Sequence, residues 1–372
     1  MTGATTGCRG MARRIGAGLA AAFVVLTGCT TPGGARGHGP SGATMVRTLR
    51  SLLPPGKISG AHGKGVGPVQ GRLPSSPSAE LIFDGGRAVA RVSVAIVRLS
   101  VPVPDLFAQC PDSAYRPYDR CTSTVLSDGS RLNLDAAPLR QDRPSGARQW
   151  AAQVTAPSGT QVVVSESSVP APGGADTMAD APPLSLHALG RIAASAAWKP
   201  LMNVLPESET GSSSAATDTQ PSGGGDKQPT IMAASITAAL TPLLRDFRIA
   251  DRGGSPGFGH LTVDDGHGRS LLAVNVQQWK VHDPALVPVF GHAEALSDGT
   301  LVTTGAGPST HGGAGAVEWT ADMLRPNGLR VFVSEVNAPG YGVPATRAAP
   351  PISLAGLRRI SLDRTWQRFA EG

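Results

Sequence analysis

The sequence predicts an α+β protein made of two homologous repeats, each an antiparallel meander of about six strands with an N-terminal and a C-terminal helix. Three observations predict this fold class: an internal duplication, short stretches of alternating apolar residues, and turn signals between them. The chain of 372 residues is long enough for two domains, and its 47 glycines and 32 prolines indicate many turns.

The duplication is clearest at the end of each copy. Residues 181–189 (APPLSLHAL) recur as residues 349–357 (APPISLAGL), and both copies then reach a tryptophan at the same spacing, Trp198 and Trp366. Further matches upstream, such as VVVSE ending at Glu166 and VFVSE ending at Glu335, keep an offset of 168 to 170 residues. Because order and offset barely drift, we interpret the match as a true duplication.

Alternating apolar residues and glycine turns predict the strands of each copy. An Asp-Gly turn precedes an alternating apolar run in both copies, which is the signature of a half-buried hairpin. Two more hairpins are expected around Ser-Asp-Gly and around Pro-x-Gly, each of which occurs in both copies. The alternating positions are Val92, Val94 and Ile96 in the first copy and Leu272, Val274 and Val276 in the second.

Helices are predicted at the two ends of each copy. Apolar residues at helical spacing precede the first hairpin, and in the last helix Ser353 is the expected N-cap of a stripe formed by Leu354, Leu357 and Ile360. Residues 207–230 are polar and rich in Gly and Ser, which is typical of a flexible linker. The predicted organisation is a signal peptide at 1–28, a tether at 29–42, repeat one at 43–206, the linker at 207–230 and repeat two at 231–372.

The N-terminus carries a short apolar run. Residues 15–26 form twelve uncharged positions after Arg13 and Arg14, whereas a membrane-spanning helix needs about 20 apolar residues. The run has the length of a signal-peptide core. Translation starts at either Met1 or Met11. It ends in Leu26-Thr27-Gly28-Cys29, which resembles the lipobox of bacterial lipoproteins, and the composition as a whole resembles exported actinobacterial lipoproteins.

The lipobox resemblance covers only the first thirty or so residues, but it implies a location. It implies that Cys29 receives diacylglycerol, becomes the first residue of the mature chain and anchors it to the extracytoplasmic face of the cell membrane. Lipid chains bind through buried methylene groups, so such an anchor is durable. The alternative is a secreted protein that is cleaved nearby and keeps Cys29 as an ordinary thiol.

Cys110 and Cys121 are the remaining thiols of the mature chain. Two cysteines in an exported chain normally pair, and closing a loop of about ten residues contributes about 2–3 kcal/mol. We therefore expect a structural disulfide rather than a redox or metal site. The second copy carries residues 289–295 at the equivalent place, so the disulfide is predicted to be an embellishment of one copy.

Five histidines of the second copy are considered as candidate metal ligands. His260 and His267 flank the turn at Asp264 and Asp265, and imidazole with carboxylate suits Zn²⁺ if the two histidines face each other. Their spacing matches no metal-binding motif, so we expect solvated loop residues and predict no metal ligands; a metal site is the alternative. No cofactor is predicted. The other three histidines are His282, His292 and His311.

Motifs typical of enzymes are not found in the sequence, which contains no nucleophile elbow, Walker motif or dinucleotide fingerprint. The run His62-Gly-Lys-Gly-Val-Gly67 is interpreted as a loop. Glu166 and Glu335 are expected to be outward residues at strand ends. The repeated pairs Trp150/Trp319 and Trp198/Trp366 are expected in the cores.

The sequence therefore favours a membrane-anchored, non-enzymatic binding or scaffolding protein. Its formal net charge is +6 without a basic run, so a nucleic-acid partner is not supported. The expected partners are membrane lipid, through Cys29, and an unidentified protein or small molecule. Two alternatives remain, an envelope hydrolase and a metal-binding protein, both of which would use the histidines of the second copy.

Overall fold

The computed structural model describes residues 39–66, 76–169, 181–203, 205, 231–280 and 283–370. The predicted signal peptide, Cys29, the tether up to residue 38, the linker and His282 lie outside the described residues. Among the residues described, no helix combines the length and the apolar character that a membrane crossing requires.

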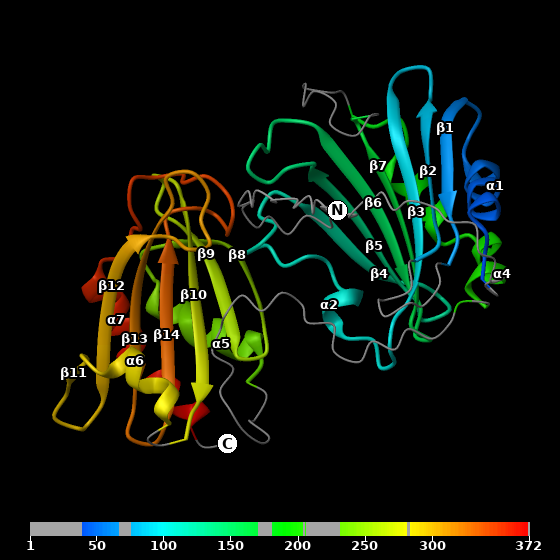
Figure 1. Ribbon diagram of the computed structural model, residues 1–372. Helices are drawn as coiled ribbons and strands as arrows, with labels where there is room; N and C mark the ends of the chain where they lie inside the picture. Colours follow the sequence, from blue (N-terminus) through cyan, green and yellow to red (C-terminus); the bar gives the residue numbers. More distant parts are fainter. Residues whose placement is uncertain are drawn as a thin grey trace, which may run out of the picture. The chain divides into compact units, whose positions relative to one another are not determined.

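The first repeat contains an antiparallel sheet of seven strands, which lie side by side in the order β1-β2-β3-β7-β6-β5-β4 (Figure 1). The three predicted hairpins are β2–β3, β4–β5 and β6–β7. The strand bounds are β1 Lys57–Lys64, β2 Ser78–Asp84, β3 Val89–Arg98, β4 Arg120–Val125, β5 Arg131–Pro138, β6 Arg148–Thr155 and β7 Thr160–Ser167.

The second repeat contains a sheet of the same topology, in the order β8-β9-β10-β14-β13-β12-β11. Each strand has its counterpart in the first sheet, which confirms the duplication at the level of structure. The bounds are β8 Arg248–Ser255, β9 Phe258–Asp264, β10 Arg269–Gln278, β11 Glu294–Ala295, β12 Leu301–Pro308, β13 Val317–Leu324 and β14 Leu329–Val336.

Each sheet has seven strands where about six were predicted, because an edge strand precedes the first hairpin. In the first repeat this strand is β1, whose second half covers His62 to Lys64, so the interpretation of that run as a loop was wrong. Most side chains of β1 are exposed, and only Ile58 and Ala61 are half-buried against the core, so the strand shows no apolar alternation. The strand is held by backbone pairing with β2, with a register shift between Ser59 and His62.

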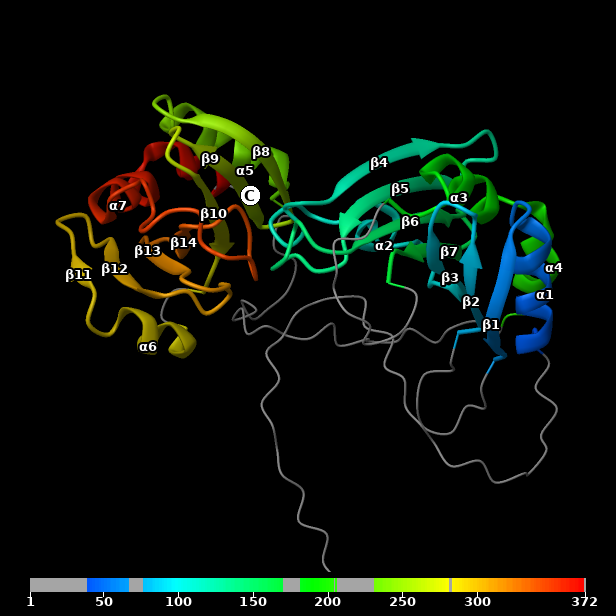
Figure 2. The same ribbon diagram turned by 90° about the horizontal axis from the view of Figure 1, so that it is seen from above.

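The longer helices stand before and after each sheet in the sequence. Figure 2 shows α3 lying over one face of the first sheet, where it packs on β5, β6 and β7. In the second repeat α7 packs on β12, β13 and β14 and α5 on β8 and β9. These helices are α1 Gly42–Leu52, α3 Leu186–Ala193, α5 Ala233–Leu240 and α7 Leu354–Leu362, and the short ones are α2 Asp105–Ala108, α4 Lys199–Met202 and α6 Val287–Phe290.

The tryptophan of each closing segment lies at the centre of a core. Trp198 and Trp366 are fully buried, as predicted, and each indole Nε1 donates a hydrogen bond to a carbonyl six residues earlier. The distances are 2.7 Å to the oxygen of Ile192 and 2.6 Å to that of Ile360. Around them pack the aliphatic residues of one sheet face and of the helices, in one cluster per repeat.

Glu166 and Glu335 are fully buried, so their expected outward orientation was wrong. Each carboxyl group accepts a hydrogen bond from a backbone N–H that leads into the closing helix, from Leu184 at 3.2 Å and from Ile352 at 3.1 Å. A buried N–H needs such an acceptor, and this need explains why a glutamate is kept inside. Burial raises the pKa of both glutamates to about 8, so both are protonated at neutral pH.

Candidate functional site

The described histidines of the second repeat do not gather into one site. His260 is fully buried on β9, whereas His267, His292 and His311 are exposed. Within the described part of the chain, no group of three or more His, Cys, Asp or Glu side chains has a geometry that could hold a metal ion.

His260 and His267 do not face each other across the hairpin, as the alternative of a metal site would require. The β9–β10 register pairs Asp264 with Arg269 and His260 with Ala273, so His267 lies in the turn itself. His260 instead contacts Asp112 of the first repeat, with 2.7 Å between its Nε2 atom and the Asp112 Oδ1 atom. Sequence reasoning could not have found this partner, because 148 residues separate the two.

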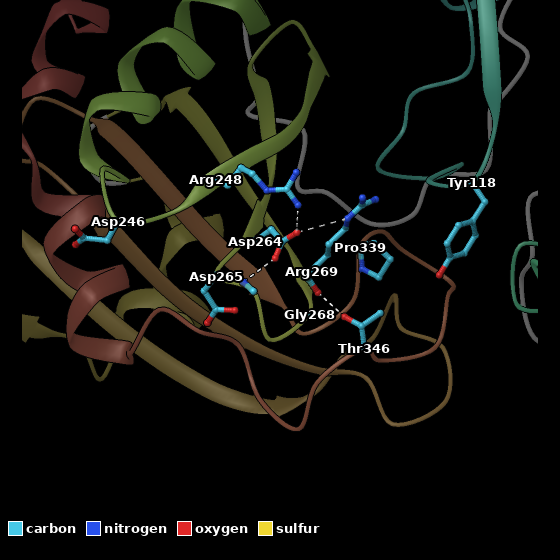
Figure 3. Close-up of a pocket in the computed structure, with 10 residues that line it drawn as sticks. Tyr118, Asp246, Arg248, Asp264, Asp265, Gly268, Arg269, Pro339 and Thr346 are labelled. Carbon is cyan, nitrogen blue, oxygen red and sulfur yellow. Dashed lines mark hydrogen bonds and ion pairs between the residues drawn. The ribbon is translucent and has the colours of Figure 1, made fainter.

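The same hairpin borders an open hollow of about 840 Å³ (Figure 3). Its wall is charged and polar, with two glycines that leave backbone groups accessible. The lining residues are Tyr118, Asp246, Arg248, Asp264, Asp265, Gly266, Gly268, Arg269, Pro339 and Thr346.

At the centre of this hollow two arginines flank one aspartate. The strand register places Arg248 of β8 and Arg269 of β10 on either side of Asp264 of β9. The Arg248 guanidinium forms an ion pair with Asp264, and the Nε atom of Arg269 lies 4.0 Å from the same carboxylate. Asp264 also accepts the backbone N–H of Gly266 at 2.8 Å. This backbone hydrogen bond and the Arg248 side chain lower the pKa of Asp264, which is therefore ionised.

Both arginines remain open to solvent. Their side chains are 69% and 53% exposed, against 13% for Asp264. Each guanidinium has five N–H donors in a planar fork, and a single carboxylate shared between two forks leaves most of these donors available. Figure 3 shows the carboxylate of Asp246 turned away from Arg248 and Asp264.

Neighbouring residues hold the lining of the hollow in place. The Nη1 atom of Arg347 binds Asp265 at 2.8 Å, and the hydroxyl of Thr346 donates to the carbonyl of Arg269 at 2.7 Å. Tyr118 of the disulfide loop also lines the hollow, and burial raises its pKa despite the opposing charge of Arg269. The hollow thus offers guanidinium donors, a phenol and backbone groups beside the carboxylates of Asp246, Asp264 and Asp265, and its guanidinium donors suit an anionic group of a ligand.

The first repeat carries different chemistry at the same positions. Asp84 occupies the place of Asp264 and likewise accepts a backbone N–H, from Gly86 at 2.8 Å. Its strand neighbours are Lys57 and Val89, where the second repeat has the two arginines. Val89 is 42% exposed, so its position tolerates an apolar side chain in solvent. The paired-arginine arrangement therefore belongs to the second repeat.

One of the two arginines of the hollow could have been predicted from the sequence. Once the Asp-Gly turn fixes the hairpin register, Arg269 is placed beside Asp264 by counting across the turn. Arg248 could not be placed in this way, because β8 is an edge strand with a register shift between Ile249 and Asp251.

The disulfide between Cys110 and Cys121 is present, with 5.8 Å between the two Cα atoms. No protein-family model matches the chain, no curated protein matches it, and no solved structure matches it.

Proposed function

We propose that the protein is a lipid-anchored, extracytoplasmic binding protein whose two α+β repeats serve as a scaffold, and that the hollow of the second repeat holds an anionic group of its ligand. The lipobox ending in Cys29 supports the anchor. The hollow with its two arginines supports a binding role. The ligand class is a molecule that carries carboxylate or phosphate groups, because guanidinium forks match both geometrically.

The single observation that carries the binding role is the sharing of Asp264 by Arg248 and Arg269. An exposed ion pair contributes little to stability, typically about 0–1 kcal/mol, so two arginines on one carboxylate are not explained by folding alone. Nor does the fold require them, because the first repeat forms the same hairpin with Lys57 and Val89. A role in recognition accounts for their position.

The histidine-based alternatives gain no support from the geometry. A hydrolase or a metal site would need convergent side chains, whereas His260 is buried against Asp112 and His267, His292 and His311 are exposed. We therefore keep binding as the proposed function.

Binding can be tested with two defined polyanions, poly-glutamate for carboxylate and polyphosphate for phosphate, with neutral dextran as the uncharged reference. The R248Q/R269Q variant removes both guanidinium groups from the hollow. The matched control is R50Q/R87Q, which removes the same charge from exposed positions of the first repeat.

We expect the wild-type chain and the control to bind at least one polyanion, and R248Q/R269Q to bind it at least about tenfold more weakly, since two charge-assisted contacts are lost. Binding should also weaken as salt rises, because exposed charges are screened. Equal weakening in both variants would show nonspecific charge attraction and would contradict the proposal.

The anchor needs its own test. Cells fed labelled palmitate should incorporate the label into the wild-type chain and not into the C29A variant, and only the wild type should sediment with membranes. Equal labelling of both would remove the anchor and leave the binding role of the hollow untouched.

A further inference from the structure

The loop closed by the disulfide makes the contacts that join the first repeat to the second. Both repeats lie within one compact unit, Ala35–Gly372. Asp112 binds His260, the carbonyl of Ala114 accepts the backbone N–H of Tyr341 at 2.6 Å, and the rings of Tyr115 and Tyr341 lie 5.3 Å apart. A side-chain contact at hydrogen-bond distance, a backbone hydrogen bond and a ring contact thus arise from four consecutive residues, 112–115.

The contact between Asp112 and His260 is largely buried. The His260 side chain is fully buried and that of Asp112 is only 28% exposed. Burial alone would raise the pKa of Asp112, but its interactions with the His260 side chain, together with hydrogen bonds from the backbone of Ala114 and Gly254, outweigh burial and lower that pKa. The pair is therefore a buried, charge-assisted contact, the kind whose removal weakens an interface most.

The second repeat is shaped to receive this contact. Gly253 of β8 lies opposite His260 in the strand register. A Cβ atom at Gly253 would stand 2.5 Å from the Nε2 atom of His260 and 3.1 Å from the Oδ2 atom of Asp112. The first repeat has His62 and Glu80 at the corresponding positions, so this opening is specific to the second repeat.

The loop is held in shape by its own bonds. The disulfide joins its ends, and inside it Asp112 accepts the N–H of Ala114 at 2.8 Å. Arg116 binds Asp119 at 2.7 Å, and Gln141 donates to the other oxygen of Asp119 at 2.6 Å. A loop ordered in advance loses less conformational entropy when it docks.

We propose that the disulfide loop 110–121 is the interaction element that docks the first repeat onto the second, with Asp112 and His260 as its specific contact and the disulfide as the bond that preorganises it. The partner of the loop is the β8–β9 surface of the same chain. The disulfide is absent from the second repeat. In this proposal it orders the loop for docking, in addition to stabilising the first repeat. This inference does not rest on the lipid anchor or on the identity of the ligand, although Tyr118 of the same loop lines the hollow.

The test measures the distance between the repeats by single-molecule energy transfer in the full chain, with dyes on unnatural amino acids at the exposed positions Arg50 and His292. The decisive variant is G253A. It leaves Asp112 and His260 chemically unchanged, but its Cβ atom displaces the imidazole of His260. Its matched control is G307A on β12, where a Cβ atom would meet nothing within 4 Å.

We expect one narrow distance population for the wild type and for G307A. In G253A and in D112A, the ratio of docked to undocked molecules should fall about tenfold or more, the size expected when a buried charge-assisted hydrogen bond is lost. D112N should fall less, because its amide oxygen still accepts from Nε2. The fraction of docked molecules should also fall in C110S/C121S and in the wild type treated with a dithiol. In the second case each reduced disulfide takes two electrons and two protons from the dithiol, which itself becomes a disulfide.

Circular dichroism and the unfolding midpoint of each variant establish that both repeats remain folded, so undocking is measured rather than loss of structure. Unchanged distances in both G253A and D112A would overturn the assignment of Asp112 and His260 as the docking contact. Unchanged distances in C110S/C121S would overturn the role of the disulfide.

Discussion

The two repeats share a backbone plan but differ at their exposed positions, and the comparison separates what folding needs from what recognition uses. In both copies a buried glutamate accepts the N–H before the closing helix, a serine caps that helix, and a buried tryptophan donates to the carbonyl of an isoleucine. The caps are Ser185 and Ser353. These positions satisfy buried polar groups or fill the core, and they have stayed the same.

The differences gather where side chains reach solvent or the other repeat. The first repeat carries Lys57 and Val89 beside Asp84, where the second repeat carries Arg248 and Arg269 beside Asp264. Where the first repeat has a disulfide loop, the second has α6, whose Phe290 packs with Trp279 and Leu286 in a small cluster. Duplication has thus kept one scaffold and changed its surface.

The largest effect is expected from the shared tryptophans. W198A and W366A should each lower the free energy of unfolding by about 3–5 kcal/mol, because a fully buried indole leaves a cavity. Hydrogen exchange resolved by peptide should show the loss of protection in the repeat that carries the change. Equal loss in both repeats would contradict the independence of the two cores.

The disulfide should have a smaller effect, confined to one copy. C110S/C121S is expected to lower the free energy of unfolding of the first repeat by about 2–3 kcal/mol, mainly because the unfolded chain gains freedom. Chemical denaturation measures the change. An unchanged midpoint would show that the other bonds of the loop suffice to order it.

The buried glutamates predict a dependence on pH common to both repeats. Their folded-state pKa of about 8 lies above the unfolded value near 4.5, so their contribution to stability is complete below pH 4.5 and is lost as pH rises through 8. Between pH 5 and 9, E166Q and E335Q should each flatten this decline by up to about 4 kcal/mol, since one pKa unit corresponds to about 1.4 kcal/mol. Denaturation series across that range check it, and a wild-type curve as flat as that of the variants would contradict the buried protonated state.

Much of this fold could be predicted from the sequence, because the duplication gave each turn and strand twice. The Asp-Gly, Ser-Asp-Gly and Pro-x-Gly turns all join strands, and Ser353 caps its helix as expected. The edge strands β1 and β8 were missed because their side chains follow no apolar alternation. The buried glutamates were misplaced because a carboxyl group that serves a distant N–H looks like a solvated one in the sequence.

The candidate site was harder to predict for a different reason. The hollow depends on Arg248, on Thr346 and on Tyr118, which come from three distant segments. Local patterns drew attention instead to the histidines, whose positions are set by long-range contacts such as that of His260 with Asp112. Sequence periodicity reports local structure well and reports tertiary partners poorly.

The most direct test of the account exchanges the differing hairpin residues and counts bound poly-glutamate by isothermal titration at low ionic strength. We predict one site on the wild-type chain, loss of that site in R248K/R269V, and a second site in K57R/V89R, where the paired arginines are built around Asp84. Undiminished affinity in R248K/R269V would contradict the claim that the arginine-flanked aspartate of the second repeat is the binding site.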